Sequence, residues 1–186
     1  MDHELVVPQL AAGDALLLRP WELGEADLTL VREAADDPYI QRVTSVPPSS
    51  AADAGAAFVR RQWESGADGS GYPFVIVRRE DDRPVGAIGL WLKDIDNGRA
   101  WIGYWVVEHA RGHGIAATAL RAVTAWGLSE LQIPRLQLSV EQWNTASIRT
   151  AERAGYHREG LLRQWQEIDG ERRDMFMYSM LRTDLA

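Results

Sequence analysis

The sequence predicts an α/β fold built on one mixed sheet. Short apolar runs bounded by turn residues indicate strands, and longer stretches with apolar residues three and four apart indicate helices. One strand–helix–strand segment can join two parallel strands, which a tight turn cannot do. The chain has 186 residues, 46% of them hydrophobic, which suits a single core. We therefore expect one domain over residues 1–186, with residues 1–13 as a loosely attached leader.

The first third of the chain reads as strand, helix, loop and helix. A short apolar strand covers residues 15–18. Apolar residues at helical spacing follow over residues 28–35, and Asp36-Asp37-Pro38 stops that helix. The second helix opens with Ser50 and Asp53 in capping-box spacing.

Three adjacent strands occupy the middle of the chain. Residues 72–92 read as two strands around the turn Asp81-Asp82-Arg83, and residues 99–107 read as a third strand after Asn97-Gly98. Because each connection is a short turn, these strands are expected to form an antiparallel meander.

The C-terminal half supplies the parallel unit and a hairpin. A helix over residues 114–130 is the crossover to a buried-looking strand over residues 135–140. A further helix over residues 145–154 ends at Gly155, which can adopt the left-handed conformation of a helix C-terminus. Two strands then flank Asp169-Gly170, a hairpin signal. The total is seven strands, mostly antiparallel, flanked by about four helices.

Composition excludes several classes of function. The chain has no cysteine, and its four histidines form no H-x-x-x-H pair on a helix, because His109 and His113 have that spacing but stand in a glycine-punctuated loop; we therefore expect no metal site. A net charge of -7 argues against nucleic-acid binding, which needs a basic surface. No window approaches the roughly 18 apolar residues of a membrane span, and no signal segment opens the chain. We expect a cytoplasmic protein without a membrane partner.

One loop carries the strongest chemical signal. In "VVEHARGHGIAATALRAV" a strand passes through a basic, glycine-punctuated stretch into a helix. The N-terminus of a helix leaves backbone N–H groups unpaired and binds anions. Gly112 and Gly114 let the backbone approach a ligand closely, and Arg111 and His113 add positive charge. Successive N–H groups from Arg111 to Ala116 can therefore cradle a pyrophosphate.

Three other interpretations of this loop compete with the pyrophosphate cradle. The glycines alone are equally compatible with a simple tight turn between strand and helix. A nucleoside-triphosphate loop needs a lysine followed by serine or threonine, which is missing. The dinucleotide fingerprint is met minimally by Ala117, but the strands before the loop form a meander and Gln132 occupies the position of the expected acidic residue.

Four motifs together resemble a known family. "RGHGIA" matches the R/Q-x-x-G-x-G/A signature of the GNAT superfamily of N-acetyltransferases. The segments "IGYWVVEHARGHGIAATAL", "NTASIRTAERAGY", "EGLLR" and "GERRDMFMYSML" resemble, in that order, its ribosomal-protein N-terminal, RimJ/RimL-like branch. The resemblance extends from about Leu16 to Leu181. It implies a GNAT fold, in which the sheet splays between its central parallel strands.

The resemblance also implies an activity and roles for residues. The implied reaction is transfer of an acetyl group from acetyl-CoA to a primary amine, on a protein N-terminus or a small molecule, directly within a ternary complex. Asn144 is similar to a pantetheine-binding residue and Ser147 to the group that protonates the departing thiolate. Both residues also suit a plain helix cap. Backbone N–H groups of Val106 or Val107 would polarise the thioester carbonyl. The implied pyrophosphate cradle consists of Arg111, Gly112, His113, Gly114, Ile115 and Ala116.

The general base is less clearly marked. The positions where relatives carry a glutamate are Trp101 and Gln166 in this chain. Glu141, at the end of the strand over residues 135–140, and Glu167, in the C-terminal hairpin, are the remaining carboxylate candidates, and a chain of ordered water is the alternative. We take Glu141 as the predicted base.

The acceptor and the rival function complete these expectations. Among the eight tryptophans, Trp143 and Trp165 are predicted to line the acceptor pocket. The rival function is an acyl-CoA-binding regulatory module with little or no turnover, because the two usual carboxylates are missing. By family analogy, the C-terminal hairpin could also form a homodimer.

Overall fold

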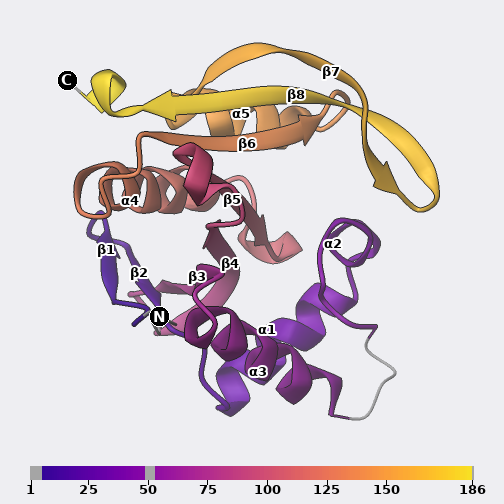
Figure 1. Ribbon diagram of the computed structural model, residues 1–186. Coiled ribbons are helices and arrows are strands. Elements are labelled where there is room, and N and C mark those ends of the chain that lie inside the picture. Colours follow the sequence, from indigo (N-terminus) through magenta and orange to yellow (C-terminus); the bar gives the residue numbers. More distant parts are fainter. Residues whose placement is uncertain (1–5, 49–52, 186) are drawn as a thin grey trace.

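The computed structural model describes residues 6–48 and 53–185 and contains one mixed sheet (Figure 1). Within these residues the strands are β1 (Leu10–Ala12), β2 (Leu16–Arg19), β3 (Gly71–Arg78), β4 (Arg83–Trp91), β5 (Arg99–Val106), β6 (Arg135–Glu141), β7 (His157–Ile168) and β8 (Glu171–Leu181). The α-helices are α1 (Glu25–Ala35), α2 (Pro38–Val43), α3 (Ala54–Ala67), α4 (Ile115–Ser129) and α5 (Thr145–Arg153).

The strand order β1-β2-β3-β4-β5-β6-β8-β7 confirms the predicted mixed sheet. All neighbouring strands are antiparallel except β5 and β6. These two parallel strands pair only from Arg99 with Arg135 to Trp101 with Gln137. Beyond Trp101 they diverge, which is the predicted splay of the sheet.

Helices cover both faces of the sheet. On one face, Trp126 of α4 packs edge-on against Tyr72 and Phe74 of β3, with ring centroids 4.8 and 5.8 Å away. On the other face, Phe58 of α3 packs edge-on against Trp21 at 5.1 Å. Figure 1 shows α1 and α3 together below the sheet, and the β7–β8 hairpin curving down toward α2. The apolar core therefore fills both layers between helices and sheet.

Two expectations about the N-terminal third were wrong. The sheet has eight strands, not seven, because residues 10–12 of the expected loose leader pair with β2 as a hairpin and bury Ala12 to 1% exposure. Gly13, with φ of 60°, makes the tight turn. The predicted capping role of Ser50 lies outside the described residues, and Asp53 makes no side-chain cap.

A fifth helix, α2, occupies the stretch expected to be a loop. Asp37 caps α2 by accepting hydrogen bonds from the N–H groups of Tyr39 and Ile40, at 2.8 and 3.1 Å. Pro38 stands in the first turn of α2, where a missing N–H costs nothing. The Asp-Pro pair therefore both ends α1 and starts α2. Only the end of α1 was predicted from the sequence.

A buried ion pair fixes α1 to the sheet. Asp27 of α1 is 1% exposed and accepts two hydrogen bonds from the guanidinium of Arg19 of β2, at 2.9 and 2.6 Å. The N–H of Glu22 donates to the same carboxylate at 2.8 Å. The hydrogen bond to Asp27 raises the pKa of Arg19, so the pair stays charged.

We expect Arg19→Ala to destabilise the protein by about 3–5 kcal/mol, because it leaves the Asp27 carboxylate buried without its cation. Urea unfolding followed by circular dichroism measures the loss. The control is Arg78→Ala, which removes the exposed pair with Asp81 and should change stability little. Equal losses in the two variants would contradict a structural role for the buried pair.

Candidate active site

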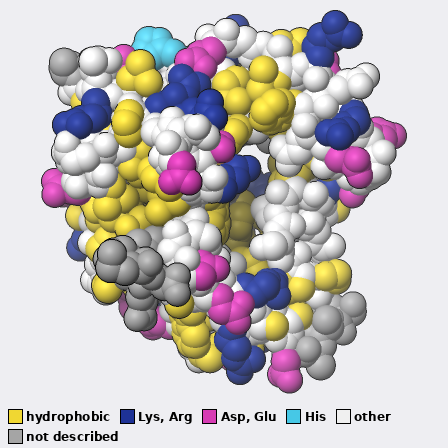
Figure 2. Space-filling model, viewed as in Figure 1, with side chains coloured by type: hydrophobic (Ala, Val, Ile, Leu, Met, Phe, Trp, Pro, Cys, Tyr) yellow, Lys and Arg dark blue, Asp and Glu magenta, His cyan; other side chains and the backbone are white. Residues whose placement is uncertain are grey.

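A cavity of about 480 Å³ opens where β5 and β6 separate. Figure 2 shows the surface hollowed between these strands and α2, with apolar side chains inside. Among the described residues that line it, the only charged side chains are Lys93 and Glu141. The cavity therefore combines apolar and polar surface, with one cation and one carboxylate.

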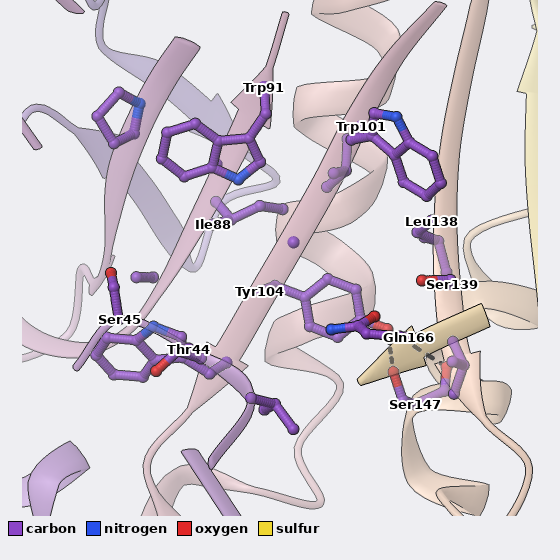
Figure 3. A pocket seen from close by; sticks show the side chains of 18 of the residues that line it. Thr44, Ser45, Ile88, Trp91, Trp101, Tyr104, Leu138, Ser139, Ser147 and Gln166 are labelled. Atoms are coloured by element: carbon purple, nitrogen blue, oxygen red, sulfur yellow. Dashed lines mark hydrogen bonds between the residues drawn. The ribbon is translucent and has the colours of Figure 1, made fainter. Parts of the chain in front are cut away.

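The N-terminus of α5 lies in the wall of this cavity. Asn144 is the N-cap of α5, and its Oδ1 accepts a hydrogen bond from the N–H of Ser147 at 3.0 Å. The hydroxyl of Ser147 lies 2.8 Å from the hydroxyl of Tyr104 of β5 (Figure 3). Asn144 and Ser147 thus both line the cavity. Asn144 caps the helix, and Ser147, in the same turn, carries the hydroxyl.

Glu141 lies in the same wall, linked to Asn144 through Tyr39. The Glu141 side chain is 3% exposed. The Tyr39 hydroxyl donates a hydrogen bond to its Oε2 at 3.0 Å and accepts one from Nδ2 of Asn144 at 3.0 Å. Arg42 of α2 lies 3.9 Å from the same carboxylate oxygen. A continuous chain of contacts therefore runs from Arg42 to the first turn of α5.

Two tyrosines of the site were missed in the sequence analysis. Burial raises the pKa of Tyr39 to about 12, and the nearby charge of Glu141 adds to that effect. Burial likewise raises the pKa of Tyr104 to about 12. Both hydroxyls therefore keep their protons at neutral pH. The "IGYW" alternation could have indicated that Tyr104 faces opposite to Trp101 and Trp105.

The glycine loop has the backbone geometry of an anion site. Gly112 and Gly114 have φ of 84° and 75°, the left-handed region that favours glycine, and a Cβ built at either would meet nothing within 4 Å. Gly114 is the N-cap of α4 and provides no side-chain cap. In the described part of the chain, the N–H groups of residues 112–117 have no hydrogen-bond acceptor. These groups, here called the cradle, are free to bind an anion.

Arg111 sits beside the cradle but contributes differently than expected. Its N–H donates to the carbonyl of Glu108, so it is not part of the cradle. Its Nε donates to the carbonyl of Val106 at 2.8 Å, and its guanidinium pairs with Asp37 at the start of α2. His113 is exposed, and the side chain of Ile115 is buried in the core, so Ile115 offers only its N–H.

Of the two predicted carbonyl-polarising groups, only one is free. The N–H of Val107 donates to the carbonyl of Val85 at 3.1 Å, so its predicted role was wrong. In an antiparallel ladder the neighbouring pair, Val106 with Gly86, makes no mutual hydrogen bonds. The N–H of Val106 therefore points toward the side of β6, where β5 has already lost its strand partner.

The two tryptophans predicted to line the acceptor pocket do not line this cavity. Trp143 and Trp165 are 57% and 48% exposed, and neither lines the cavity. Side chains alternate along β7, so Gln166 faces the cavity while Trp165 faces solvent. Trp143 packs against the outer side of Tyr39, with ring centroids 5.0 Å apart. The tryptophans that line the cavity are Trp21, Trp91, Trp101 and Trp105.

The arrangement of splayed strands, glycine loop and capped helix matches known proteins. A family described as "Acetyltransferase (GNAT) domain" matches residues 15–157. The chain belongs to the GNAT acetyltransferase family. The resemblance drawn from the four sequence motifs is thereby confirmed, together with the enzyme class.

Similar proteins place the acetyltransferase near the RimJ/RimL-like branch. The uncharacterized N-acetyltransferase p20 of Bacillus licheniformis is 28% identical over 173 residues, which cover 93% of this chain and 96% of p20. The probable N-acetyltransferase YjcK of Bacillus subtilis is 34% identical over 116 residues, 61% of this chain and 63% of YjcK. The structure of Mycobacterium smegmatis RimJ in complex with CoA-disulfide superposes with a TM-score of 0.79 at 26% identity, covering 96% of this chain and 88% of RimJ.

The described part of the acetyltransferase contains neither a metal-holding group of side chains nor a membrane-spanning helix. No group of three or more histidine, aspartate or glutamate side chains there could hold a metal ion. Nor is any helix in that part long and apolar enough to cross a membrane.

We expect the tyrosines of the acetyltransferase to resist alkaline titration. Burial holds Tyr39 and Tyr104 protonated well above the ordinary pKa of about 10. As the pH is increased, the phenolate absorbance of the folded protein should therefore rise at higher pH than that of the urea-unfolded chain, whose five tyrosines titrate together. Tyr104→Phe should leave the rise around the ordinary pKa unchanged. A full-sized absorbance step there in the folded wild type would contradict the buried network.

Proposed function

We propose that this acetyltransferase transfers an acetyl group from acetyl-CoA to a primary amine, directly within a ternary complex. The observation that carries the proposal is the cradle: adjacent unpaired N–H groups at an uncapped helix N-terminus, directly after the strand that borders the cavity. Such a terminus carries about half a positive charge and suits a pyrophosphate. The similar RimJ structure is a complex with CoA-disulfide, which supports the same donor.

The residues present fit acetyl-CoA. Residues 112–117 would hold the pyrophosphate through their backbone N–H groups, since no side chain fills the space above the two glycines. Asn144 would bind the pantetheine arm, because its Oδ1 and Nδ2 lie in the cavity wall. Bound acetyl-CoA supplies an activated thioester carbonyl. The N–H of Val106 would polarise that carbonyl, a type of contact worth roughly 3 kcal/mol in a transition state.

Ser147 and Tyr104 are placed to hand a proton to a leaving sulfur. Their hydroxyls are 2.8 Å apart, and the raised pKa keeps Tyr104 protonated. When Tyr104 donates to Oγ of Ser147, the serine hydroxyl is left free to donate into the cavity. The pair therefore forms a short proton relay that ends on Ser147.

Glu141 is the group proposed to accept the proton of the incoming ammonium. An alkyl amine has a pKa near 10 and is mostly protonated at neutral pH, so a base must act before attack. Of the described residues that line the cavity, Glu141 is the only carboxylate. Tyr39 donates to its Oε2, and no described residue donates to Oε1. Glu167, the other candidate, is exposed and lies outside the cavity lining.

One observation favours the second candidate function, an acyl-CoA-binding module. Trp101 and Gln166, the two positions where relatives carry glutamate, both line the cavity with neutral side chains. Under that alternative the protein would bind acetyl-CoA but release no thiol with any amine. Calorimetric binding of acetyl-CoA combined with a thiol-release screen over peptides, polyamines and aminoglycosides separates the two functions.

Ser147→Ala is expected to lower kcat about 10²–10⁴-fold, the usual range for a general acid. Its affinity for acetyl-CoA should stay near the wild-type value, because Asn144 and the cradle remain. Thr145→Ala is the matched control, an exposed hydroxyl in the same helical turn. Thiol release at the wild-type rate by Ser147→Ala would remove this residue from the mechanism.

Glu141→Gln should lower kcat by a similar factor while the glutamine can still accept the hydrogen bond from Tyr39. Because the variant must wait for amine that is already neutral, its kcat should recover as the pH rises toward the pKa of the acceptor. Glu167→Gln is the control for the loss of one negative charge. A pH profile of Glu141→Gln parallel to that of the wild type would show that another group is the base.

A further inference from the structure

The register of the sheet creates an aromatic slot on the cavity side of β5. Three cross-strand pairs follow one another on this face: Trp91 with Trp101, Gly89 with Gly103, and Ala87 with Trp105. Gly103 therefore lies between the tryptophans at positions 101 and 105 of the same strand. All of these residues line the cavity. In this slot Gly103 forms the floor, and the indoles of Trp101 and Trp105 form the walls.

The indole of Trp91 lies across the glycines of β3 and β4. A Cβ built on Gly89 would be 2.6 Å from Cζ2 of Trp91, and one built on Gly71 would be 2.6 Å from its Cε3. Only hydrogen at both positions lets the ring lie this close to the sheet. Gly103 differs, because its Cβ would meet nothing nearer than Nε1 of Trp91, at 3.7 Å. The floor above Gly103 is open and exposed.

Trp101 is held as a fixed wall. Its Nε1 donates a hydrogen bond to Asp94 at 2.7 Å, and Nζ of Lys93 lies 4.7 Å from its ring centroid. Figure 3 shows the indoles of Trp91 and Trp101 at one end of the cavity, and Tyr104 and Ser147 at the other. Tyr104 follows Gly103 in β5 and points to the opposite face, so the slot and the proposed proton relay lie on the two faces of this strand and both line the one cavity where β5 and β6 separate.

The charges at the slot decide what it can hold. Lys93 already lies over the Trp101 ring, and it repels a second cation at that position. Glu141 is the only carboxylate among the described residues that line the cavity, and Arg42 lies 3.9 Å from it, so it can balance one ammonium but not the several of a polyamine. A polyamine is therefore disfavoured, although tryptophan faces can bind cations in general. A flat, uncharged ring suits the glycine floor and the indole walls.

We propose that the acceptor is a primary amine joined by a short arm to a planar aromatic group, which sits over Gly103 between Trp101 and Trp105. This inference rests on the proposed acetyl transfer and names its class of substrate. The ring lies in the slot, and the arm passes through the gap between β5 and β6, which places the amine toward Ser147 and Glu141. Contacts with two indoles favour an aromatic group over an alkyl chain of similar length by about tenfold.

The test compares three amines as acceptors with acetyl-CoA: tryptamine, hexylamine and spermidine. We expect kcat/KM for tryptamine to exceed both others by at least about tenfold. Gly103→Val, whose side chain fills the floor of the slot, should remove that preference and leave the KM for acetyl-CoA unchanged. Gly160→Val is the matched control, since Gly160 lies in β7 outside the cavity lining and a Cβ there meets nothing within 4 Å.

Two further variants test the slot independently of Gly103→Val. Trp101→Leu should reduce the preference for tryptamine if Gly103→Val does not fold, and Lys93→Gln should raise kcat/KM for spermidine. Equal or better use of spermidine or hexylamine by the wild type overturns the slot while leaving acetyl transfer intact. If none of the three amines is acetylated, calorimetry decides on the slot: binding of tryptamine by the wild type but not by Gly103→Val supports it, and no binding overturns it, while the screen over peptides and aminoglycosides decides acetyl transfer separately.

Discussion

The site depends on how soon β5 and β6 stop pairing. Three parallel positions hold the two strands together, and beyond Trp101 and Gln137 each strand keeps only its outer antiparallel neighbour. The gap exposes backbone of β5 that a continuous sheet would have used in its ladder, including the N–H of Val106. It also opens the cavity between the two halves of the molecule. The donor site and the proposed acceptor site thus both lie where the hydrogen-bonded pairing of β5 and β6 ends.

Helix α2 stabilises both sides of that break. Its capping residue, Asp37, accepts the guanidinium of Arg111 next to the cradle. Its Tyr39 joins the wall formed by Glu141 and α5. Its Arg42 lies 3.6 Å from Asp169 at the tip of the β7–β8 hairpin. One short helix therefore contacts the donor loop, the proposed base and the C-terminal hairpin. A small shift of α2 would change all three contacts.

The sequence predicted those features of the fold and site that depend on residues close together in the chain. The glycine loop, the capped start of α5 and the Asp169-Gly170 turn depend on neighbouring residues in the chain, and all three are visible in the sequence. Tyr39 could not be found in that way, because its partners, Glu141 and Asn144, are about a hundred residues away. Trp165 was misplaced for the same reason: which face of β7 meets the cavity follows from pairing with β8, whose register shifts at a bulge.

The ring of Trp91 lying on Gly71 and Gly89 makes these three positions interdependent in evolution and in engineering. Neither glycine can acquire a side chain while the indole is present, since any Cβ would overlap it. A smaller residue at position 91 would have to come first, and the freed surface could then accept a larger residue at position 89, whereas a Cβ at position 71 would still lie 2.7 Å from the carbonyl oxygen of Leu90. The order in which substitutions are introduced therefore decides which reshaped pockets can be reached. Libraries that vary these positions one at a time would miss them.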